Sequence, residues 1–174
     1  MKRVALLATG DEIINGDILN TNGQIIADLL IHNGIQPGMH MVASDDQKEL
    51  LLAMRFLLEH HDALITIGGL GPTSDDRTRF ALGDALEQPL VFDDNSWQQI
   101  INRLERFKLQ IPESNRQQCL FPENAEILEN TNGTANACKI IDNSKRIYML
   151  PGPPNECLPL FKSAILPDLL SSDL

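Results

Sequence analysis

Residues 66–79 read Thr-Ile-Gly-Gly-Leu-Gly-Pro-Thr-Ser-Asp-Asp-Arg-Thr-Arg. It follows an apolar run over residues 62–67 and leads into a helical pattern over residues 80–86, so it predicts a strand, a glycine turn and a helix start. Glycines let the backbone approach a ligand with no Cβ in the way, and a helix N-terminus offers free amides and a positive dipole end. Such a loop lies at the carboxyl ends of the strands of an open α/β sheet, where ligands bind. We therefore expect an anion-binding site here.

The loop differs from the common nucleotide fingerprints. It contains neither Gly-x-Gly-x-x-Gly nor Gly-Lys-Ser/Thr, which argues against dinucleotide redox chemistry and ordinary nucleoside-triphosphate hydrolysis. The glycines alone would also fit an ordinary tight turn between a strand and a helix, so this alternative stays open. The adjacent acids Asp75 and Asp76 would repel a phosphate unless a cation stood between them, so they favour a metal-bridged phosphate. The alternative is that they cap the helix and carry its first-turn charge.

The composition fits one globular domain. The chain has 174 residues, of which 43% are hydrophobic, and this length is enough to bury a full core. The formal net charge of −10 argues against binding to nucleic acid or an anionic membrane, because phosphate polymers would be repelled. Backbone amides and a cation can still hold a small anion on an acidic protein. We therefore expect a small phosphate-bearing ligand as partner, and neither nucleic acid nor a membrane.

The cysteines and the start of the chain indicate the compartment. Cys119, Cys138 and Cys157 are far apart and form no Cys-x-x-Cys motif, so we expect reduced core thiols rather than disulfides or a zinc site. The sequence opens directly on a strand pattern over residues 3–8, with no signal-peptide pattern and no apolar run as long as a membrane helix. We therefore expect a cytoplasmic protein.

Strand and helix patterns alternate through the first half of the chain. The continuous apolar run over residues 4–8 is typical of a central strand covered on both faces. A capping box of Thr21 and Gln24 predicts a helix that ends at Asn33-Gly34. A short strand over residues 39–43 and a helix from residues 44–46 to residues 60–61 follow. This order predicts right-handed βαβ units.

The second half predicts more helices and one hairpin. A helix begins near Asp93 or Asp94 and reaches Phe107, and we expect its apolar stripe to face the core. A helical turn over residues 113–119 follows Pro112. Strand patterns over residues 137–141 and 146–150 flank a hairpin turn at residues 142–145, and a last helix runs to about residue 170.

Three other positions could serve the same site. The polar loop over residues 9–17 follows the first strand, although Thr9-x-x-Glu12 also matches a capping box that would make it a short helical turn. Asp45 or Asp46 follows the second strand; one is needed as N-cap, and we take Asp45 as the candidate metal ligand. Residues 151–156 follow the last strand. They could line the crevice, or they could simply form the turn between that strand and the next helix.

The paired histidines His60 and His61 invite a metal interpretation. Adjacent helical residues point in different directions, and no partner lies four residues away. We therefore expect them to complement the negative end of the helix dipole.

Six spaced stretches resemble the N-terminal domain of the CinA (competence-damage-inducible) proteins, within the wider molybdopterin-binding, molybdenum-cofactor-biosynthesis family. They cover residues 9–12, 16–22, 68–76, 115–118, 133–135 and 151–156. The resemblance implies a three-layer α/β/α fold with a mostly parallel sheet and a β-hairpin, as a single domain over residues 1–174. The C-terminal amidohydrolase domain of full-length CinA proteins has no counterpart here, so no deamidase activity is expected.

The resemblance also implies an activity and a site. CinA-like domains imply hydrolysis of the pyrophosphate of ADP-ribose and related nucleotides with a divalent metal, and the wider fold implies molybdopterin binding. When the family's site residues are carried over to this sequence, Asp75 and Asp76 would hold the metal or orient water as the catalytic pair. The expected ligand-binding residues are Thr9, Gly10, Asp11, Glu12, Asn22, Gly68, Gly69, Leu70, Gly71, Pro72, Thr73, Ser74, Pro151, Gly152, Pro153 and Glu156.

Two departures from the family pattern keep an alternative open. Relatives usually carry an acid where this chain has Phe80, and many carry Pro-Gly where it has Asn136-Ala137. The missing acid favours the alternative of a molybdopterin- or nucleotide-binding module without turnover. Oligomers are usual in the family, so the resemblance also implies a homodimer or a homotrimer.

Overall fold

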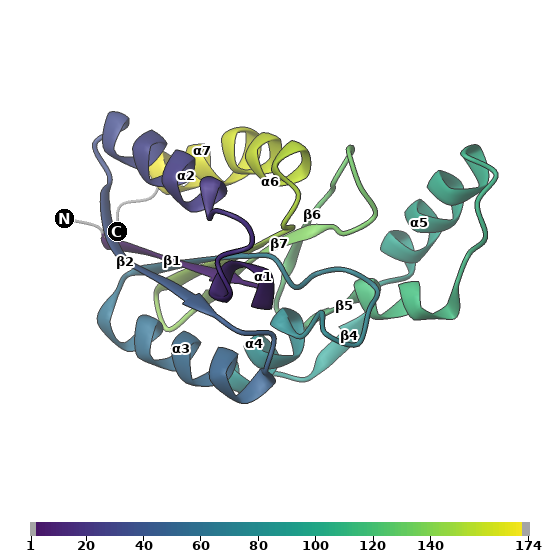
Figure 1. Ribbon diagram of the computed structural model, residues 1–174, viewed down its shortest axis with the longest axis horizontal. Helices are drawn as coiled ribbons and strands as arrows, with labels where there is room; N and C mark the ends of the chain where they lie inside the picture. The colour runs from purple at the N-terminus through teal and green to yellow at the C-terminus, as the bar shows by residue number, and fades with distance from the viewer. Residues whose placement is uncertain (1–2, 172–174) are drawn as a thin grey trace.

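The structure is a computed structural model that describes residues 3–171. A six-stranded sheet forms its centre, in the order β2-β1-β3-β8-β7-β6 (Figure 1). β2, β1, β3 and β8 run parallel to one another, and β7 and β6 are antiparallel to their neighbours. The strands of this sheet are β1 (Arg3–Thr9), β2 (Gln36–Ala43), β3 (Ala63–Ile67), β6 (Glu126–Leu128), β7 (Ala137–Asp142) and β8 (Lys145–Leu150).

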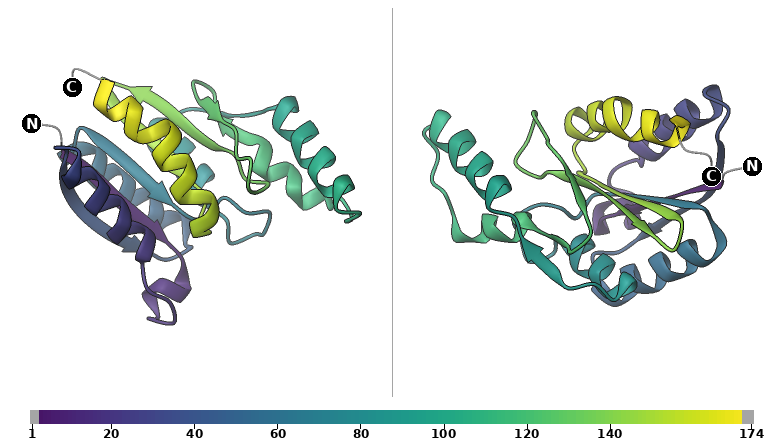
Figure 2. Two further views of the ribbon diagram at one scale, coloured as in Figure 1. Left: turned by 90° about the horizontal axis from the view of Figure 1, so that it is seen from above. Right: turned by 180° about the vertical axis from the view of Figure 1, so that it is seen from behind.

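Helices cover both faces of this sheet, which gives the three-layer α/β/α fold that the sequence predicts (Figures 1 and 2). One face carries α2 (Thr21–His32), α6 (Pro154–Leu160), the π-helical turn η2 (Phe161–Ile165) and α7 (Leu166–Ser171). The other face carries α3 (Gln47–His60) and α4 (Thr78–Leu86).

The first strand illustrates why a central strand reads as a continuous apolar run. Successive side chains of a strand point to opposite faces of the sheet. Val4 and Leu6 join the core cluster beneath α2, whereas Ala5 and Leu7 join the cluster beneath α3 and α4. Because both faces are covered, none of the four side chains is more than 1% exposed. β3 repeats the pattern and is buried throughout.

The predicted hairpin is confirmed. Asp142 pairs with Lys145 across the turn between β7 and β8. Asn143 and Ser144 have φ values of 46° and 66°, and positive φ at both central residues is the pattern of a type I′ hairpin turn.

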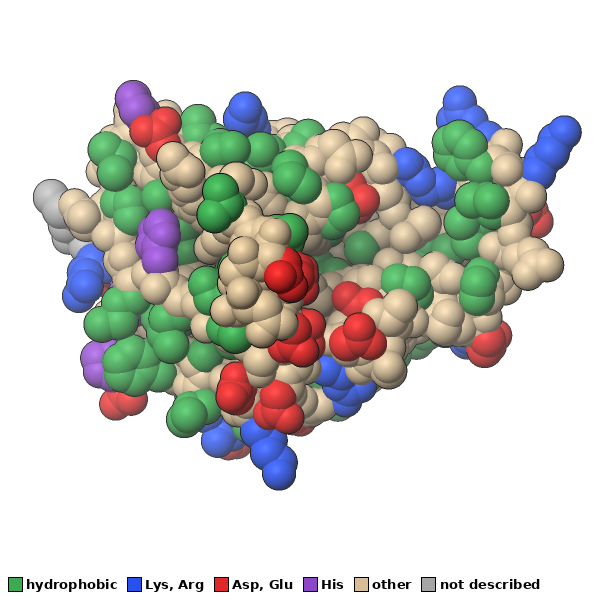
Figure 3. Space-filling view, in the orientation of Figure 1, with side chains coloured by type: hydrophobic (Ala, Val, Ile, Leu, Met, Phe, Trp, Pro, Cys, Tyr) green, Lys and Arg blue, Asp and Glu red, His purple; other side chains and the backbone are tan. Residues whose placement is uncertain are grey.

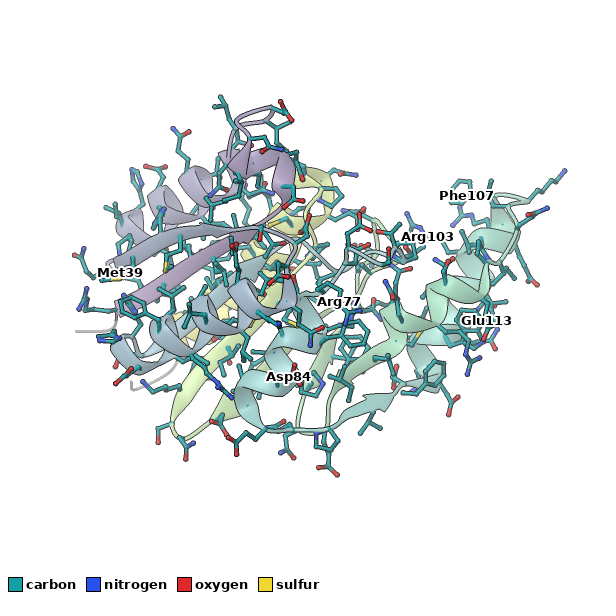
Figure 4. All side chains as sticks on the ribbon, turned by 60° about the horizontal axis from the view of Figure 1, so that its bottom comes forward. Met39, Arg77, Asp84, Arg103, Phe107 and Glu113 are labelled. Atoms are coloured by element: carbon teal, nitrogen blue, oxygen red, sulfur yellow. The ribbon has the colours of Figure 1, made fainter. Side chains whose placement is uncertain are left out.

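A separate lobe projects from the sheet (Figure 2). It contains α5 (Asp94–Arg106), the 3₁₀ turn η1 (Glu113–Cys119) and the two-stranded sheet of β4 (Leu90–Phe92) and β5 (Leu120–Pro122). The expectation that the apolar stripe of the α5 segment faces the core is wrong at its end. Ile100 is buried, but Phe107 is 60% exposed at the outer end of the helix (Figure 4).

Two predicted helix caps differ from the observed ones. The cap of α2 is Asn20 instead of Thr21, and its side-chain oxygen accepts from Gly23 N at 3.0 Å. Residues 11–14 do form a helical turn, α1 (Asp11–Ile14), but Gly10 precedes it and no side chain caps it, so the Thr9 capping box is wrong. The choice left open at α3 is settled: Asp46 is the N-cap and accepts from the amides of Lys48 and Glu49.

His61 also differs from its predicted role. It is 3% exposed, its Nδ1 donates to Leu57 O at 2.9 Å, and its Nε2 accepts from Met39 N at 3.1 Å. An Nε2 that accepts an amide proton carries none itself, so this ring is a neutral link between α3 and β2 rather than a charge at the helix end. His60 keeps the predicted position, with Nδ1 2.8 Å from Phe56 O.

Asp168 fastens α7 to the sheet. Its carboxylate accepts from Arg146 Nη1 at 2.7 Å, from Lys139 Nζ at 2.9 Å and from Tyr148 Oη at 2.6 Å. Burial alone would raise the pKa of Asp168, but the hydrogen bonds from Tyr148 and Lys139 and the charge of Arg146 outweigh it and lower that pKa.

The three cysteines are free and buried, as predicted. Burial raises the pKa of Cys119 to about 11 and the pKa values of Cys138 and Cys157 to about 12. These groups therefore stay as unreactive thiols at neutral pH. Across residues 3–171, no helix is both long and apolar enough to cross a lipid bilayer.

Candidate functional site

The candidate site lies where the loops after β1, β3 and β8 meet, at the carboxyl ends of these parallel strands. They enclose a cleft of about 630 Å³, within the size range of small-molecule sites. Gly68 N donates to Leu150 O at 2.9 Å, which joins the loop after β3 to the end of β8. The side-chain amide of Asn22 donates to Gly152 O at 2.7 Å and so joins α2 to the loop after β8.

Most of the predicted site residues line this cleft. They are Thr9, Gly10, Glu12, Asn22, Asp45, Gly68, Gly69, Leu70, Gly71, Pro72, Asp75, Asp76, Pro151, Gly152, Pro153 and Glu156. Three further candidates, Asp11, Thr73 and Ser74, do not line it. Gln118, Thr134 and Ala135 do, although only their place in two of the six family stretches pointed to them.

The glycine loop needs its glycines for two reasons. Gly68 and Gly69 have φ values of 101° and 66°. Residues other than glycine rarely adopt this backbone conformation. A Cβ on Gly69 would clash with Thr78 Oγ1. This hydroxyl donates to Gly68 O at 2.8 Å, and Thr78 N donates to Gly69 O at 3.3 Å. The first amide of α4 is therefore taken up by the loop and is not free for a ligand.

Asp76 closes the loop and does not cap the helix. One of its carboxylate oxygens accepts from Thr73 N at 2.9 Å and from Thr73 Oγ1 at 2.6 Å. α4 begins only at Thr78 and has no side-chain cap, so the alternative that the acid pair caps this helix is wrong. Asp75 is exposed, and within residues 3–171 its carboxylate accepts only from Ser74 Oγ, at 3.1 Å. Of the two acids, Asp75 is thus the one more available to a ligand.

Arg79 is a buried cation behind the loop that the sequence reasoning missed. It is 0% exposed, and its guanidinium donates to Leu70 O at 3.1 Å and to Gln118 O at 3.5 Å. Burial lowers the pKa of Arg79 to about 10, so the group still carries its charge at neutral pH. No carboxylate in the described part of the chain forms an ion pair with it. Its charge therefore favours an anion at the glycine loop.

Carboxylates gather on the rim of the cleft, where Figure 3 shows acidic side chains around a hollow. Asp11 and Asp45 hold each other reciprocally: each backbone amide donates to the other carboxylate at 3.2 Å. Burial raises the pKa of Asp45, and the negative charges of Asp11, Glu12 and Asp75 raise it further, against the opposing hydrogen bond from Asp11 N. This electrostatic crowding is what a bound cation would relieve.

The donor set fits a hard divalent cation in part. Carboxylate oxygens are the ligands that Mg²⁺ and Mn²⁺ prefer, and Asp45 and Asp75 both line the cleft. Within residues 3–171, however, no three His, Cys, Asp or Glu side chains are placed to surround one ion. A cation here would need oxygens from the ligand, and Mg²⁺ is commonly held by one or two carboxylates together with phosphates.

Two buried polar atoms of the cleft lack partners. Thr9 Oγ1 and Asn22 Oδ1 are fully shielded and form no hydrogen bond within residues 3–171, and both residues line the cleft. An unpaired buried polar group is costly. The Thr9 hydroxyl can donate to an anion, whereas Asn22 Oδ1 can only accept from a hydroxyl or N–H group of a ligand. Because both atoms are shielded, either contact requires the side chain to turn toward the cleft.

The two departures from the family pattern have different consequences. Phe80 is not among the described residues that line the cleft, and Arg77 lies over its ring, with Cζ 4.2 Å from the ring centroid. Asn136 ties α5 to the cleft wall, since its Nδ2 donates to Ser96 Oγ at 2.9 Å and its Oδ1 accepts from Asn130 N at 2.9 Å. Neither substitution removes a lining carboxylate.

The family of the chain follows from its sequence. A family profile described as "Probable molybdopterin binding domain" matches residues 5–171, and the chain belongs to this family of molybdopterin-binding domains. Its relatives are of the CinA type, as the six sequence stretches predict.

The similarity to CinA-type proteins holds for sequence and for structure. A competence-damage inducible protein of Clostridium botulinum strain 657 is 41% identical over 167 residues, which are 96% of this chain and 41% of that protein. The crystal structure of CinA from Thermoplasma acidophilum, described as of unknown function, has a TM-score of 0.88 and 30% identity and covers 97% of this chain and 98% of its own. The chain therefore spans about two-fifths of the curated relative and nearly all of that solved structure.

The wider fold extends to a molybdopterin biosynthesis enzyme. The structure of MoaB from Thermus thermophilus has a TM-score of 0.61 and 19% identity, and it covers 98% of this chain and 95% of its own. At this identity the likeness concerns the fold.

Proposed function

We propose that the cleft binds a small phosphate-bearing ligand, either a nucleotide diphosphate such as ADP-ribose or molybdopterin. The observation that carries the proposal is the unpartnered buried hydroxyl of Thr9 in a cleft beside the glycine loop, because a hydroxyl can donate to a phosphate oxygen. The buried charge of Arg79 behind that loop supports an anionic ligand. The family description and the name of the MoaB structure agree with a pterin phosphate.

For a diphosphate ligand, we propose metal-dependent hydrolysis. Asp45 and Asp75 would share a divalent cation with the diphosphate oxygens, and the glycine loop would orient the diphosphate. When bound, such a cation neutralises phosphate charge and lowers the pKa of a coordinated water. A water oxygen would attack one phosphorus as the bridging P–O bond breaks and the second phosphate leaves, and Glu12, a further carboxylate of the cleft, would accept the proton of that water. ADP-ribose would yield AMP and ribose 5-phosphate.

A binding module without turnover is the second candidate. It is favoured by Asp76, whose carboxylate is already engaged by Thr73, and by the lack of a three-ligand metal cluster among residues 3–171. The two candidates differ in products and agree on binding. ADP-ribose and a pterin monophosphate should both be tested, with and without Mg²⁺ or Mn²⁺, by calorimetry and by product analysis.

The binding proposal is tested by Thr9→Val. Valine keeps the shape of threonine and removes Oγ1, which forms no hydrogen bond inside the described chain, so folding should be unaffected. Losing one hydrogen bond to a charged ligand should weaken binding about tenfold or more. Thr66→Val is the control for a buried threonine that does not line the cleft. Its hydroxyl donates to Tyr148 O at 3.4 Å, so this variant loses a weak internal hydrogen bond, and it should still bind as the parent does. Equal affinity in Thr9→Val and the parent would contradict the proposed site.

The hydrolysis proposal is tested by Asp75→Asn with product analysis. If the parent releases AMP only with a divalent cation, this variant should lose most of that release while still binding ADP-ribose. Metal-dependent release at the parental rate would show that Asp75 is not a metal ligand. Binding without products in the parent would leave the second candidate as the function.

A further inference from the structure

One buried residue holds the first two carbonyl groups of the glycine loop. Thr78 Oγ1 donates to Gly68 O at 2.8 Å, and Thr78 N donates to Gly69 O at 3.3 Å. Thr78 is 0% exposed and does not line the cleft. Both carbonyls therefore point into the protein, toward the first turn of α4.

Two further side chains hold the third carbonyl of the loop. Leu70 O accepts from Arg79 Nη1 at 3.1 Å and from Gln118 Nε2 at 3.2 Å. Gln118 is itself fixed, because its Oε1 accepts from Asn115 Nδ2 at 2.8 Å. The three side chains around this carbonyl are all buried. The successive carbonyls of residues 68–70 are thus all engaged by groups of α4 and η1.

The amides that follow these carbonyls have no partner. In a planar trans peptide, a carbonyl and the next N–H group point in opposite directions, and residues 3–171 contain no cis peptide bond. Because the carbonyls of residues 68–70 point into the protein, the N–H groups of Gly69, Leu70 and Gly71 point the other way. None of these N–H groups donates a hydrogen bond within the described chain, and all three residues line the cleft.

A run of free backbone amides suits an anion. Successive N–H groups in a turn with left-handed residues form concavities that bind phosphate, and positive φ occurs here at Gly68 and Gly69. The unpartnered Thr9 hydroxyl adjoins this run, since a Cβ added to Gly69 would lie 3.1 Å from Thr9 Oγ1. Backbone amides without a partner are costly where water is excluded. A bound oxyanion would supply the missing acceptors.

We propose that Thr78, Arg79 and Gln118 are positioning residues, which hold the loop carbonyls on the protein side and thereby keep the three amides turned toward one oxyanion in the cleft. This inference rests on the proposed function of the cleft. Each partner acts on one peptide unit. Thr78 Oγ1 sets the direction of the Gly69 amide, whereas Arg79 and Gln118 set that of the Gly71 amide. The positioning roles can therefore be tested amide by amide.

The test follows the three amides by proton–nitrogen correlation NMR, with inorganic pyrophosphate as the probe. In the parent, the amide protons of Gly69, Leu70 and Gly71 should move to higher frequency on titration, because they donate to an anion. Thr78→Val keeps the shape of the side chain and removes the hydroxyl. It should lose the Gly69 response, keep the Gly71 response and bind pyrophosphate about tenfold more weakly. Thr78→Ser retains a hydroxyl and should restore the parental response and affinity.

Gln118→Met tests the other end of the loop. Methionine fills the volume of glutamine without its amide group, while the hydrogen bond from Arg79 remains. The Gly71 response should therefore become weaker, and the Gly69 response should match the parent. Gln98→Met is the matched control, because Gln98 is exposed on α5 and does not line the cleft. This control should match the parent at every amide.

The outcomes separate this inference from the proposed function. If Thr78→Val keeps the parental Gly69 response, or if all three responses fall together, positioning by single peptide units is overturned and the phosphate site stands. If Thr78→Val does not fold, Gln118→Met decides in the same way through Gly71. A parent whose three amides respond to none of pyrophosphate, ADP-ribose and a pterin monophosphate overturns the proposed function itself.

Discussion

The carboxylate of Asp168, at a partly buried position of α7, accepts three hydrogen bonds from charged or phenolic donors. Replacing it by asparagine would leave Arg146 and Lys139 next to each other without their shared carboxylate. We expect Asp168→Asn to lower the free energy of unfolding by about 2 kcal/mol at pH 7. Urea denaturation measures the difference, and Asp28→Asn on the exposed face of α2 is the control.

The same residue predicts a pH dependence with a definite sign. The pKa of Asp168 is lower in the folded protein than its ordinary value of 3.8. A carboxylate with a lowered folded pKa stabilises the protein fully above its unfolded pKa, and this contribution is lost as the pH falls through the folded pKa. The stability gap between parent and Asp168→Asn should therefore be constant near neutral pH and shrink below about pH 4. A gap that widens on acidification would contradict the assignment.

The burial of Arg79 could not be predicted from the sequence. An arginine in the first turn of a predicted helix looks like an exposed charge, and nothing local signals that β5 and η1 will cover it. His61 is similar, because its second hydrogen-bond partner, Met39, lies 22 residues away. By contrast, Asp45 and most of the glycine-loop residues were predictable, since they directly follow strands whose order in a parallel sheet fixes where they meet.

Among the helices and strands, those with a strong apolar pattern in the sequence were predicted, and the shortest strands were not. β1, β3, α2 and α3 follow from continuous apolar runs or from helical stripes. β4, β5 and β6 have three residues each, too few to show an alternation, and they exist because distant partners supply their hydrogen bonds. β2 begins at Gln36, earlier than predicted, because Pro37 and Gly38 hide its start in a segment with little apolar character.

The cap of α3 gives a prediction at this scale. Asp46 satisfies two amides of the first turn, at 2.9 and 3.1 Å. Asp46→Ala should lower the free energy of unfolding by about 1 kcal/mol, measured by thermal or urea denaturation. Glu59→Ala, near the exposed end of the same helix, should have a much smaller effect. Equal losses in the two variants would mean that the cap contributes no more than an ordinary exposed acid.

At the scale of the whole molecule, Asn136 couples the α5 lobe to the cleft wall. Besides Ser96, its side-chain amide donates to Gln99 Oε1 at 2.7 Å, so two turns of α5 depend on it. Asn136→Ala should increase amide hydrogen exchange in α5 several-fold, and exchange in β1 and β3 should not change. Unchanged exchange in α5 would show that the contacts of Arg103 with the carbonyls of Thr131 and Asn132 hold the lobe without it.

The cleft also depends on when its parts become available during synthesis. Asn22 and Gly152 are joined across 130 positions of the chain, and β8 inserts between β3 and β7, so that β3 lacks one of its neighbours until β8 has been made. A nascent chain that stops before β8 therefore contains the glycine loop. It lacks β8, whose end holds that loop, and it lacks the loop after β8 that forms the opposite wall of the cleft. The proposed ligand could therefore bind only after β8, the last strand of the sheet, has been inserted.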